Sequence, residues 1–323
     1  MDTPPLVSIG IPTYNRAGSL TRALESVMAQ DYPHWEALIS DNASSDETEA
    51  ICQRFCAQDV RIRFIRQPRN SGAHGNFNFV LQESGSKYFL WLADDDWLCP
   101  GFLAQCVAAL EQDPDCALAL GQVNYFQGDQ FVYREPPIVL CQKSGSERVL
   151  SYYASVTDNG QMYSLMRRSL LTSALMPRNV IGGDWLFIAA LVFQGKARTL
   201  ETTCVNRSLG GTSQNVRNIG LNLNLSRIQT NHPYLCISGF AFQETAWTSP
   251  AYASLNGMAR PALAVKIVGL IWRRYGFRVY FHAMITAVVA LAQHAAPAGL
   301  YRRLRVLYRK ATLLDHEQPG QKE

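Results

Sequence analysis

The sequence lacks several patterns that mark common protein classes. No G-x-G-x-x-G motif follows its first apolar run, which argues against a dinucleotide-binding oxidoreductase, and no Lys/Arg-bearing glycine-rich phosphate loop is found there, which disfavours a nucleotidyltransferase. The eight cysteines include no C-x-x-C pair, so a zinc-ribbon or redox motif has little support. We expect these cysteines to be buried free thiols in a reducing cytosol.

Signals for export and for membrane crossing are also missing. The N-terminal residues MDTPPLVSIGIPTYNR contain no basic segment followed by an apolar stretch, so we expect an intracellular, cytoplasmic protein. Two apolar runs near the C-terminus, Pro261–Trp272 and Val279–Ala292, are each shorter than the roughly 20 residues that a membrane-spanning helix needs. Internal repeats and low-complexity segments are absent as well.

Positive charge is concentrated at the C-terminal end. Residues 258–323 carry 11 Lys/Arg against 3 Asp/Glu, whereas the chain as a whole has a net charge of +4. Two interpretations remain open for the two apolar runs and the basic stretch 301–310 that follows them. In the first interpretation, the two runs form an amphipathic pair that lies on the anionic inner face of the plasma membrane. In the second, the runs form a helical pair that packs on the main domain or on a partner chain.

Short apolar runs alternate with amphipathic stretches over the first hundred residues, which predicts β-α-β units and an α/β fold with a mostly parallel central sheet flanked by helices. The 323 residues, 47% of them hydrophobic, support a large core. The expected strands are Val7–Ile11, Trp35–Ile39, Arg61–Ile65, Lys87–Ala93 and Ala117–Val123, and the expected helices are Ser19–Gln30, Asp46–Ala57, Gly75–Glu83 and Phe102–Glu111.

Three consecutive aspartates, Asp94, Asp95 and Asp96, follow the strongly apolar fourth strand. Adjacent carboxylates repel one another unless a cation or hydrogen bonds compensate, and Mg²⁺ or Mn²⁺ that bridges phosphate oxygens is a suitable partner. Ligands of open α/β sheets bind beyond the carboxyl ends of the strands, where this cluster lies. The alternative interpretation is an exposed acidic turn.

Two other predicted strands end in polar residues. Asp41 ends the second strand and suits a base or ribose hydroxyl, although an Asx turn and helix cap with Ser44 explains it as well. After the first strand, Tyr14 offers a ring for stacking on a nucleobase, and Arg16 offers a charge for phosphate.

Four motifs in this order resemble the family 2 glycosyltransferases of the GT-A fold. They are VSIGIPTYNR at 7–16, ISDNASSD at 39–46, RNSG at 69–72 and LADDDWLCP at 92–100. The resemblance covers residues 5–110, extends to about 215 and stops there. It implies a transferase domain at 1–215, with a nucleotide-binding half at about 1–100 and an acceptor half at about 101–215. A helical, basic C-terminal region at 216–323 follows.

The resemblance also implies roles for individual residues. Residues that would line the nucleotide pocket are Pro12, Tyr14, Asn15, Arg16 and Asp41, with Arg69 and Asn76 close by. Asp94 and Asp95 would meet the ribose and diphosphate, and Asp96 the divalent metal. The family's Asp-x-Asp-Asp-x-x-x-Pro pattern, aligned on Pro100, places Ala93 where its first aspartate usually lies, which leaves the division of labour among the three carboxylates open.

A catalytic base must lie farther along the chain, because transfer with inversion needs a carboxylate to accept the acceptor's proton. Asp184 in IGGDWLF resembles the family's downstream acidic motif, with Gly183 in place of its Glu, but an ordinary helix N-cap also explains it. Asp158, in a predicted turn, is the second candidate. Residues 206–215 are expected to form a flap that carries Arg207 over the diphosphate, and His34 and His74 are expected to be surface or packing residues.

Together these observations predict an inverting, metal-dependent glycosyltransferase of the bacterial surface-polysaccharide type. Its expected partners are a UDP, dTDP, GDP or CDP sugar and a glycan or lipid-linked acceptor, with no nucleic acid. A second hypothesis is a non-catalytic subunit that binds a nucleotide-sugar or glycan in a membrane assembly. The sugar, the base and the linkage depend on pocket shape, which shared motifs do not specify.

Overall fold

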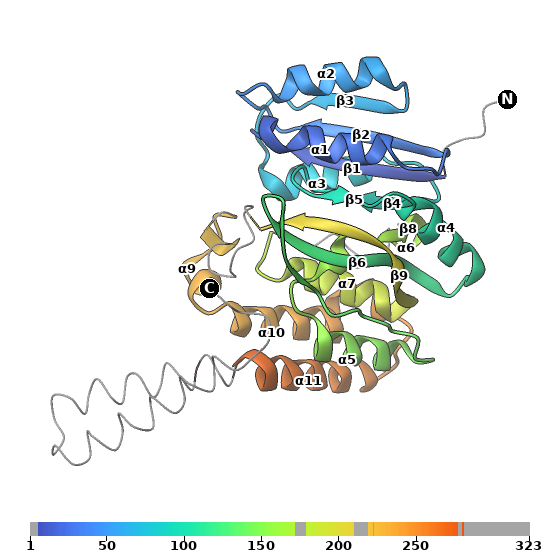
Figure 1. Cartoon of the computed structure of the whole chain (residues 1–323). Helices are drawn as coiled ribbons and strands as arrows, with labels where there is room; N and C mark the ends of the chain where they lie inside the picture. Colours follow the sequence, from blue (N-terminus) through green and yellow to red (C-terminus); the bar gives the residue numbers. More distant parts are fainter. Residues whose placement is uncertain (1–5, 172–178, 210–218, 222, 277–279, 281–323) are drawn as a thin grey trace, which may run out of the picture.

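The computed structural model describes residues 6–171, 179–209, 219–221, 223–276 and 280. Within them, one mixed sheet has the strand order β3-β2-β1-β4-β8-β6-β9-β5, with β7 paired to β6 (Figure 1). The strands are β1 (Val7–Thr13), β2 (Trp35–Asp41), β3 (Ile62–Arg66), β4 (Tyr88–Trp91), β5 (Trp97–Leu98), β6 (Cys116–Gln127), β7 (Gln130–Arg134), β8 (Leu165–Arg167) and β9 (Lys196–Ser208).

Helices pack on this sheet and on one another. They are α1 (Ala17–Met28), α2 (Thr48–Gln58), α3 (Gly72–Gln82), α4 (Phe102–Gln112), α5 (Gly145–Ser155), α6 (Arg168–Leu171), α7 (Gly183–Gln194), α9 (Arg227–Asn231), α10 (Pro233–Gln243) and α11 (Ala259–Ile271). Shorter helical turns are η1 (Gly160–Tyr163), η2 (Glu244–Thr248), η3 (Pro250–Tyr252) and η4 (Trp272–Gly276).

The N-terminal half follows the β-α-β pattern that the sequence predicts. Strands β3, β2, β1 and β4 are parallel, and the register sets Thr13 beside Asp41 and Asp41 beside Arg66. Helix α1 buries Leu20, Ala23, Leu24 and Val27, the apolar face that its periodicity indicates. The carboxyl ends of β1 and β2 therefore meet at one edge of the sheet, and the loops that follow them lie side by side.

The sheet is mixed beyond β4, so the expected mostly parallel arrangement holds for the N-terminal half alone. Strand β8 is antiparallel to both β4 and β6, and β5 is antiparallel to β9, while β6 and β9 run parallel. These antiparallel pairs join strands that are far apart in the chain, and the less regular sequence after residue 116 carries too little periodicity to reveal them. The long strand β9 thereby reaches the loop that holds the three aspartates.

A helical layer of α5, α7, α10 and α11 packs together at one end of the molecule (Figure 1). Helix α11 contains most of the first apolar run, and its Leu263, Ala264, Ile267 and Ile271 are buried. Three of these four residues share a core with Phe187 of α7, so this run packs on the main domain. Of the second run, the structure describes only residue 280. The basic stretch 301–310 and the expected domain boundary at 215 also lie outside the described residues. No helix in the described part of the chain is both long and apolar enough to cross a bilayer.

The expectation of eight free cysteines is wrong for two of them. Cys99 follows β5 and Cys204 lies on β9, and the structure joins them in a disulfide with their Cα atoms 5.3 Å apart. The antiparallel pairing of β5 with β9 brings the two thiols together, and their separation of 105 residues hides this from the sequence. The other six, Cys52, Cys56, Cys106, Cys116, Cys141 and Cys236, are free.

Candidate active site

The three aspartates lie in the short turn between β4 and β5, at the carboxyl edge of the sheet. Arg16, which follows β1, approaches two of them: its Nε lies 3.7 Å from Asp94 Oδ1 and its Nη2 lies 3.9 Å from Asp95 Oδ2. Burial raises the pKa of the Asp94 carboxyl to about 7, and the adjacent charge of Asp95 adds to that rise. The acidic cluster is therefore a half-enclosed, mutually repelling group and not an exposed turn.

Asp96 is the most enclosed of the three and pairs with Arg207. Arg207 Nε donates to Asp96 Oδ2 at 3.2 Å, and the Ser208 N–H donates to Asp96 Oδ1 at 3.0 Å. Burial raises the pKa of Asp96, while the Arg207 charge and the Ser208 N–H oppose that rise. The pair thus holds one negative and one positive charge together in a largely dry position.

Arg207 corrects the expectation of a flap. It lies on strand β9, and its guanidinium also donates to Tyr125 Oη at 2.9 Å and to Tyr163 Oη at 3.3 Å. Residues 206–208 are held in the sheet by pairing with β6, so they do not form a loop that closes over a ligand. Residues 210–215 of the expected flap lie outside the described part of the chain.

The donor atoms at this turn suit a divalent cation. Within the described residues, no group of three or more His, Cys, Asp or Glu side chains is arranged to hold a metal ion. Mg²⁺ in phosphate-binding sites is often held by only one or two protein carboxylates, the remaining positions being filled by phosphate oxygens and water. Each Asp96 oxygen accepts one bond here and retains a second lone pair, so the residues fit such a site.

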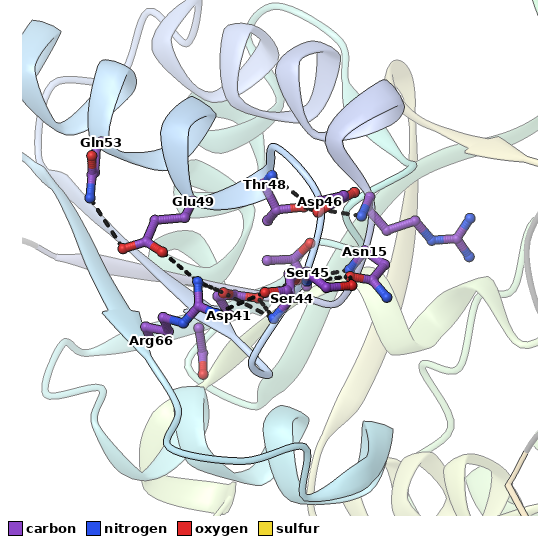
Figure 2. Close-up of polar contacts among 12 residues, drawn as sticks. Asn15, Asp41, Ser44, Ser45, Asp46, Thr48, Glu49, Gln53 and Arg66 are labelled. Atoms are coloured by element: carbon purple, nitrogen blue, oxygen red, sulfur yellow. Dashed lines mark hydrogen bonds and ion pairs between the residues drawn. The ribbon is translucent and has the colours of Figure 1, made fainter.

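The loop after β1 is tied to the loop after β2 through Asn15 (Figure 2). Asn15 adopts a left-handed backbone with φ 52°, its N–H donates to Ser44 Oγ at 2.8 Å, and its Oδ1 accepts from the Ser45 N–H at 2.8 Å. The side chain of Tyr14, next in the same loop, is exposed, and Pro12 is buried in β1. This leaves the Tyr14 ring available for stacking beside a fixed loop.

Asp41 is fully buried and forms the Asx-type contacts that the sequence offered as an alternative. It accepts hydrogen bonds from the Ser44 N–H at 3.0 Å and from the Ser44 hydroxyl, and Arg66 Nη1 lies 3.7 Å from its Oδ2 (Figure 2). These hydrogen bonds engage the side of the Asp41 carboxylate that faces Ser44. A contact between Asp41 and a nucleotide therefore stays a prediction.

Asn76 connects two strand ends. Its Nδ2 donates to the Ser40 carbonyl at 2.9 Å and to the Thr13 carbonyl at 3.2 Å, and its Oδ1 accepts from the Ser40 hydroxyl at 2.5 Å. The residue therefore holds β1 and β2 at the edge where the nucleotide loops begin. Arg69 lies exposed in the connection between β3 and α3.

Asp184 lies in the first turn of α7, after a glycine that the packing requires. Gly182 has φ 71°, and a Cβ at this position would come within 2.6 Å of the Ile237 side chain. Asn159 Nδ2 donates to Asp184 Oδ2 at 2.8 Å. Burial raises the pKa of Asp184, and the Asn159 amide, the N–H groups of the helix turn and the Arg207 charge oppose that rise.

The second base candidate, Asp158, lies exposed one residue before Asn159. Its Oδ2 accepts a hydrogen bond from Tyr133 Oη at 3.1 Å. His34 is also exposed, and His74 lies on α3 beside Asn78, which agrees with the expectation that both are surface or packing residues.

Sequence reasoning missed two residues of this region, Asn159 and Glu135. Asn159 is 1% exposed, and Glu135, just after β7, is 3% exposed. Glu135 accepts from the Gly160 N–H at 3.0 Å and from the Thr157 hydroxyl at 3.1 Å, and burial raises its pKa to about 6. The Asn-Gly pair at 159–160 signals a turn, but nothing in the sequence indicates that its amide meets Asp184 or that a distant glutamate holds it.

Arg207 and Tyr163 link the two acidic regions. The Arg207 charge opposes the burial-driven rise in the pKa of both Asp96 and Asp184. The Tyr163 hydroxyl of η1 accepts from Arg207 Nη2 at 3.3 Å, and Asn159, the residue before η1, donates to Asp184 Oδ2 at 2.8 Å. The structure therefore brings the strand-end aspartates and Asp184, which are about ninety residues apart in sequence, around shared neighbours.

Two solved structures share this architecture. The crystal structure of residues 1–349 of TarS from S. aureus aligns with a TM-score of 0.54 and 16% identity, covering 94% of this chain and 91% of that one. The mannosyltransferase PcManGT from Pyrobaculum calidifontis, solved with GDP-Man and Mn²⁺, aligns with a TM-score of 0.53 and 17% identity over 97% and 86% of the two chains. Likeness at these identities shows the fold, which is the GT-A fold.

Curated relatives match part of the chain. A GalNAc(5)-diNAcBac-PP-undecaprenol beta-1,3-glucosyltransferase of Campylobacter jejuni is 36% identical over 101 residues, which is 31% of this chain and 33% of the relative. The putative colanic acid biosynthesis glycosyl transferase WcaA of Escherichia coli is 32% identical over 160 residues, which is 49% and 57% of the two chains. The chain thus spans from a third to just over half the length of these relatives. The family model "Glycosyl transferase family 2" matches residues 8–173, just over half of the chain, and the chain belongs to this family.

Proposed function

We propose that this chain is an inverting glycosyltransferase that moves a sugar from a nucleotide-diphosphate donor to a hydroxyl of a glycan or lipid-linked acceptor in bacterial surface-polysaccharide synthesis. One observation carries the proposal: Arg207 bonds both Asp96 at the strand ends and Tyr163 of η1, and Asn159, which caps the start of η1, bonds the carboxyl of Asp184. Family membership and the printed activities of the relatives support the same reaction class.

The donor is assigned to the edge of the parallel half-sheet. The Tyr14 ring would stack on the base, and Asn15 and Pro12 would shape the loop that receives it. Asp41, Arg69 and Asn76 belong to the same pocket, with Asn76 acting through the strand ends that it holds. Arg16 lies between this loop and the aspartates, where its charge suits a diphosphate.

The three aspartates would manage the diphosphate and its metal. Asp94 and Asp95 are assigned to the ribose and diphosphate, and Asp96 to Mg²⁺ or Mn²⁺. Such an ion supplies positive charge that stabilises the departing nucleoside diphosphate. The solved mannosyltransferase of the same fold contains Mn²⁺.

Asp184 is assigned as the catalytic base. In a single displacement, the acceptor oxygen forms a bond to the anomeric carbon as the bond from that carbon to the diphosphate oxygen breaks, and the acceptor proton moves to Asp184. Burial raises the pKa of this carboxyl, which makes it a better proton acceptor once it is ionised.

The reaction is tested with purified protein and a panel of donors. UDP-GlcNAc and GDP-mannose, together with dTDP and CDP sugars, are screened by thermal shift with and without Mn²⁺ or Mg²⁺, and release of nucleoside diphosphate is then measured. We expect one donor class to raise the melting temperature in a metal-dependent manner and to be hydrolysed slowly without acceptor. Folded protein that binds and cleaves none of these donors contradicts the proposal.

Asp184→Asn separates the enzyme from the second hypothesis, a non-catalytic binding subunit. General base catalysis contributes about 10²–10⁴-fold, so the enzyme should lose turnover by about that factor while donor binding persists. Asp158→Asn is the matched control, because that aspartate is exposed and belongs to the neighbouring turn, and its rate should stay within about twofold of the parent. Unchanged biological activity of Asp184→Asn favours the binding subunit.

We place the reaction at the cytoplasmic face of the plasma membrane, with an anionic lipid surface as a partner of the basic C-terminal residues. The excess of 11 Lys/Arg over 3 Asp/Glu in residues 258–323 supports this placement. Co-sedimentation with vesicles containing phosphatidylglycerol should exceed that with neutral vesicles and should fall with added salt.

A further inference from the structure

A buried hydrogen-bond chain leads from α5 to the carboxyl of Asp184. The Tyr152 hydroxyl lies 2.7 Å from Asn159 Oδ1, and Asn159 Nδ2 lies 2.8 Å from Asp184 Oδ2. Tyr152 is fully buried and Asn159 is 1% exposed, so water does not compete for the bond between them, while Asp184 is half-buried. The contact therefore fixes one oxygen of Asp184 in a defined direction.

The ionised carboxylate of Asp184 only accepts hydrogen bonds, so the NH₂ end of the Asn159 amide faces it, and the Tyr152 hydroxyl holds the other end of the amide. The Asn159 Oδ1 atom is only an acceptor, so the Tyr152 hydroxyl must donate its proton to it. The opposite end, the NH₂ group, then points at Asp184. A reversed amide would set its oxygen against the carboxylate, which is unfavourable because neither group can donate, whereas the Tyr152 hydroxyl can donate or accept and so adapts to either end.

The backbone of Asn159 is held as firmly as its side chain. Its φ of 55° is a left-handed conformation that asparagine tolerates better than most residues. Glu135 stabilises the same turn, because its carboxylate accepts hydrogen bonds from the Gly160 N–H and the Thr157 hydroxyl. A Cβ at Gly160 would come within 2.5 Å of Glu135 Oε2, so the glycine permits this close approach.

We propose that Asn159 is a positioning residue that orients Asp184 for proton transfer, with Tyr152 fixing its amide and Glu135 fixing its turn. The inference rests on the proposed role of Asp184 as the base. A neutral amide orients the carboxylate without the strong preference for the charged form that an arginine or lysine would impose. Asp184 can then gain a proton during transfer without separating a buried ion pair.

The other ionisable groups around Asp184 come from three elements. They are Tyr152 and Tyr153 of α5, Tyr163 of η1 and Arg207 of β9. Burial raises the pKa of each of these phenols above its ordinary value, so they stay neutral below pH 9, and Arg207 stays charged. Glu135, on the far side of the turn, titrates near pH 6 and must be distinguished from Asp184 by a residue-specific probe.

The test compares variants of Asn159 that differ in one property each. Asn159→Gly keeps the left-handed backbone and removes the amide, and Asn159→Asp keeps the size and replaces the donor with an oxygen. Tyr152→Phe removes only the hydroxyl that holds the other end of the amide. Each is assayed for nucleoside diphosphate release against pH with the donor found in the panel above, and the Asp184 carboxyl is titrated by carbon-13 NMR, assigned through Asp184→Asn.

The amide donates to the charged carboxylate, so its loss should raise the pKa of Asp184. We expect Asn159→Gly to move the acidic limb of kcat/KM and the NMR titration upward by about one pH unit. Maximal kcat should fall about 10–100-fold with donor binding unchanged, because the carboxylate loses its orientation. Asn159→Asp should move the acidic limb of kcat/KM and the NMR titration of Asp184 further upward. Tyr152→Phe should move these two profiles in the same direction by a smaller amount.

Two outcomes overturn the inference. In the first, Asn159→Gly or, if that variant does not fold, Tyr152→Phe leaves the Asp184 titration and kcat unchanged. In the second, these variants lower stability and rate with no shift in either pH profile, which is the behaviour of a merely structural residue. The NMR titration requires no turnover, so a parent protein inactive with every donor refutes the proposed function, whereas an unshifted Asp184 refutes the role of Asn159.

Discussion

The two acidic regions of the candidate site are neutralised in different ways. Asp94, Asp95 and Asp96 are accompanied by arginines, with Arg16 at 3.7–3.9 Å from the first two and Arg207 at 3.2 Å from the third. Asp184 is held by a neutral amide at 2.8 Å. A carboxylate that must stay ionised to hold a metal and a diphosphate tolerates a cation beside it, whereas a carboxylate that must take up a proton is better served by a neutral donor.

We expect the largest loss of turnover when a negative charge is removed from the strand-end aspartates Asp94, Asp95 and Asp96. Asp96→Asn keeps the shape but removes the charge that a metal needs and one of the two hydrogen bonds that Asp96 accepts, so we expect turnover to fall by about 10³-fold and Mn²⁺-dependent donor binding to be lost. Calorimetry with and without Mn²⁺ measures the binding. Asp129→Asn, at an exposed aspartate, is the control. Intact metal-linked binding in Asp96→Asn would remove the metal assignment.

Arg207→Met tests the enclosed ion pair. The substitution leaves Asp96 buried without its cation, and we expect the free energy of unfolding to fall by about 3–5 kcal/mol. Arg198→Met is the matched control, because Arg198 pairs with Asp113 at 3.3 Å on the surface and should cost at most about 1 kcal/mol. Urea denaturation measures both. Equal losses in the two variants would show that burial does not distinguish these pairs.

Glu135→Gln tests how the pH dependence of stability changes when a buried carboxyl group is removed. Burial raises the pKa of Glu135 from about 4.3 to about 6, so the folded state retains this proton over a pH range in which the unfolded chain has lost it. Stability from this group is therefore lost as pH rises from about 4 to about 6, by about 2 kcal/mol in total. The variant lacks this loss, so the difference in unfolding free energy between variant and parent should move by that amount in the variant's favour between pH 4 and pH 7. A constant difference would contradict the raised pKa.

The smallest expected effect on stability belongs to Arg16. Its contacts with Asp94 and Asp95 are long and its side chain is 34% exposed, so Arg16→Gln should lower the free energy of unfolding by less than about 1 kcal/mol. Donor affinity should fall about tenfold if Arg16 meets the diphosphate. Thermal shift with and without donor separates the two quantities, and unchanged affinity would exclude Arg16 from the donor site.

The sequence predicts the N-terminal half of the fold well because its signals are local. The expected helix at Ser19–Gln30 corresponds to α1, and the expected strands at Val7–Ile11 and Trp35–Ile39 correspond to β1 and β2, with ends that differ by one or two residues. In the mixed half, the expected strand Ala117–Val123 corresponds to β6, but β5 and β8 were not predicted, since they are two and three residues long and carry no periodicity.

In the candidate site, too, some features were predictable from the sequence and others depend on long-range strand pairing. The Asp94–Asp96 cluster and its place at a strand end follow from the sequence, whereas residues 206–208, predicted as the start of a flap, lie on strand β9 and pair with β6. The disulfide between Cys99 and Cys204 depends on that same strand reaching β5. Pairings between strands a hundred residues apart leave no local pattern to detect.

By itself, the sequence determined the parallel β-α-β half, the family and the carboxylates that deserve testing, because apolar periodicity and short motifs are local properties of the chain. The tertiary structure alone decided what surrounds each carboxylate: Arg207 beside Asp96, and the Tyr152–Asn159 pair beside Asp184. The charge and proton affinity of an acidic group depend on burial and on partners within a few ångströms, and those partners come from β9, α5 and the turn after α5.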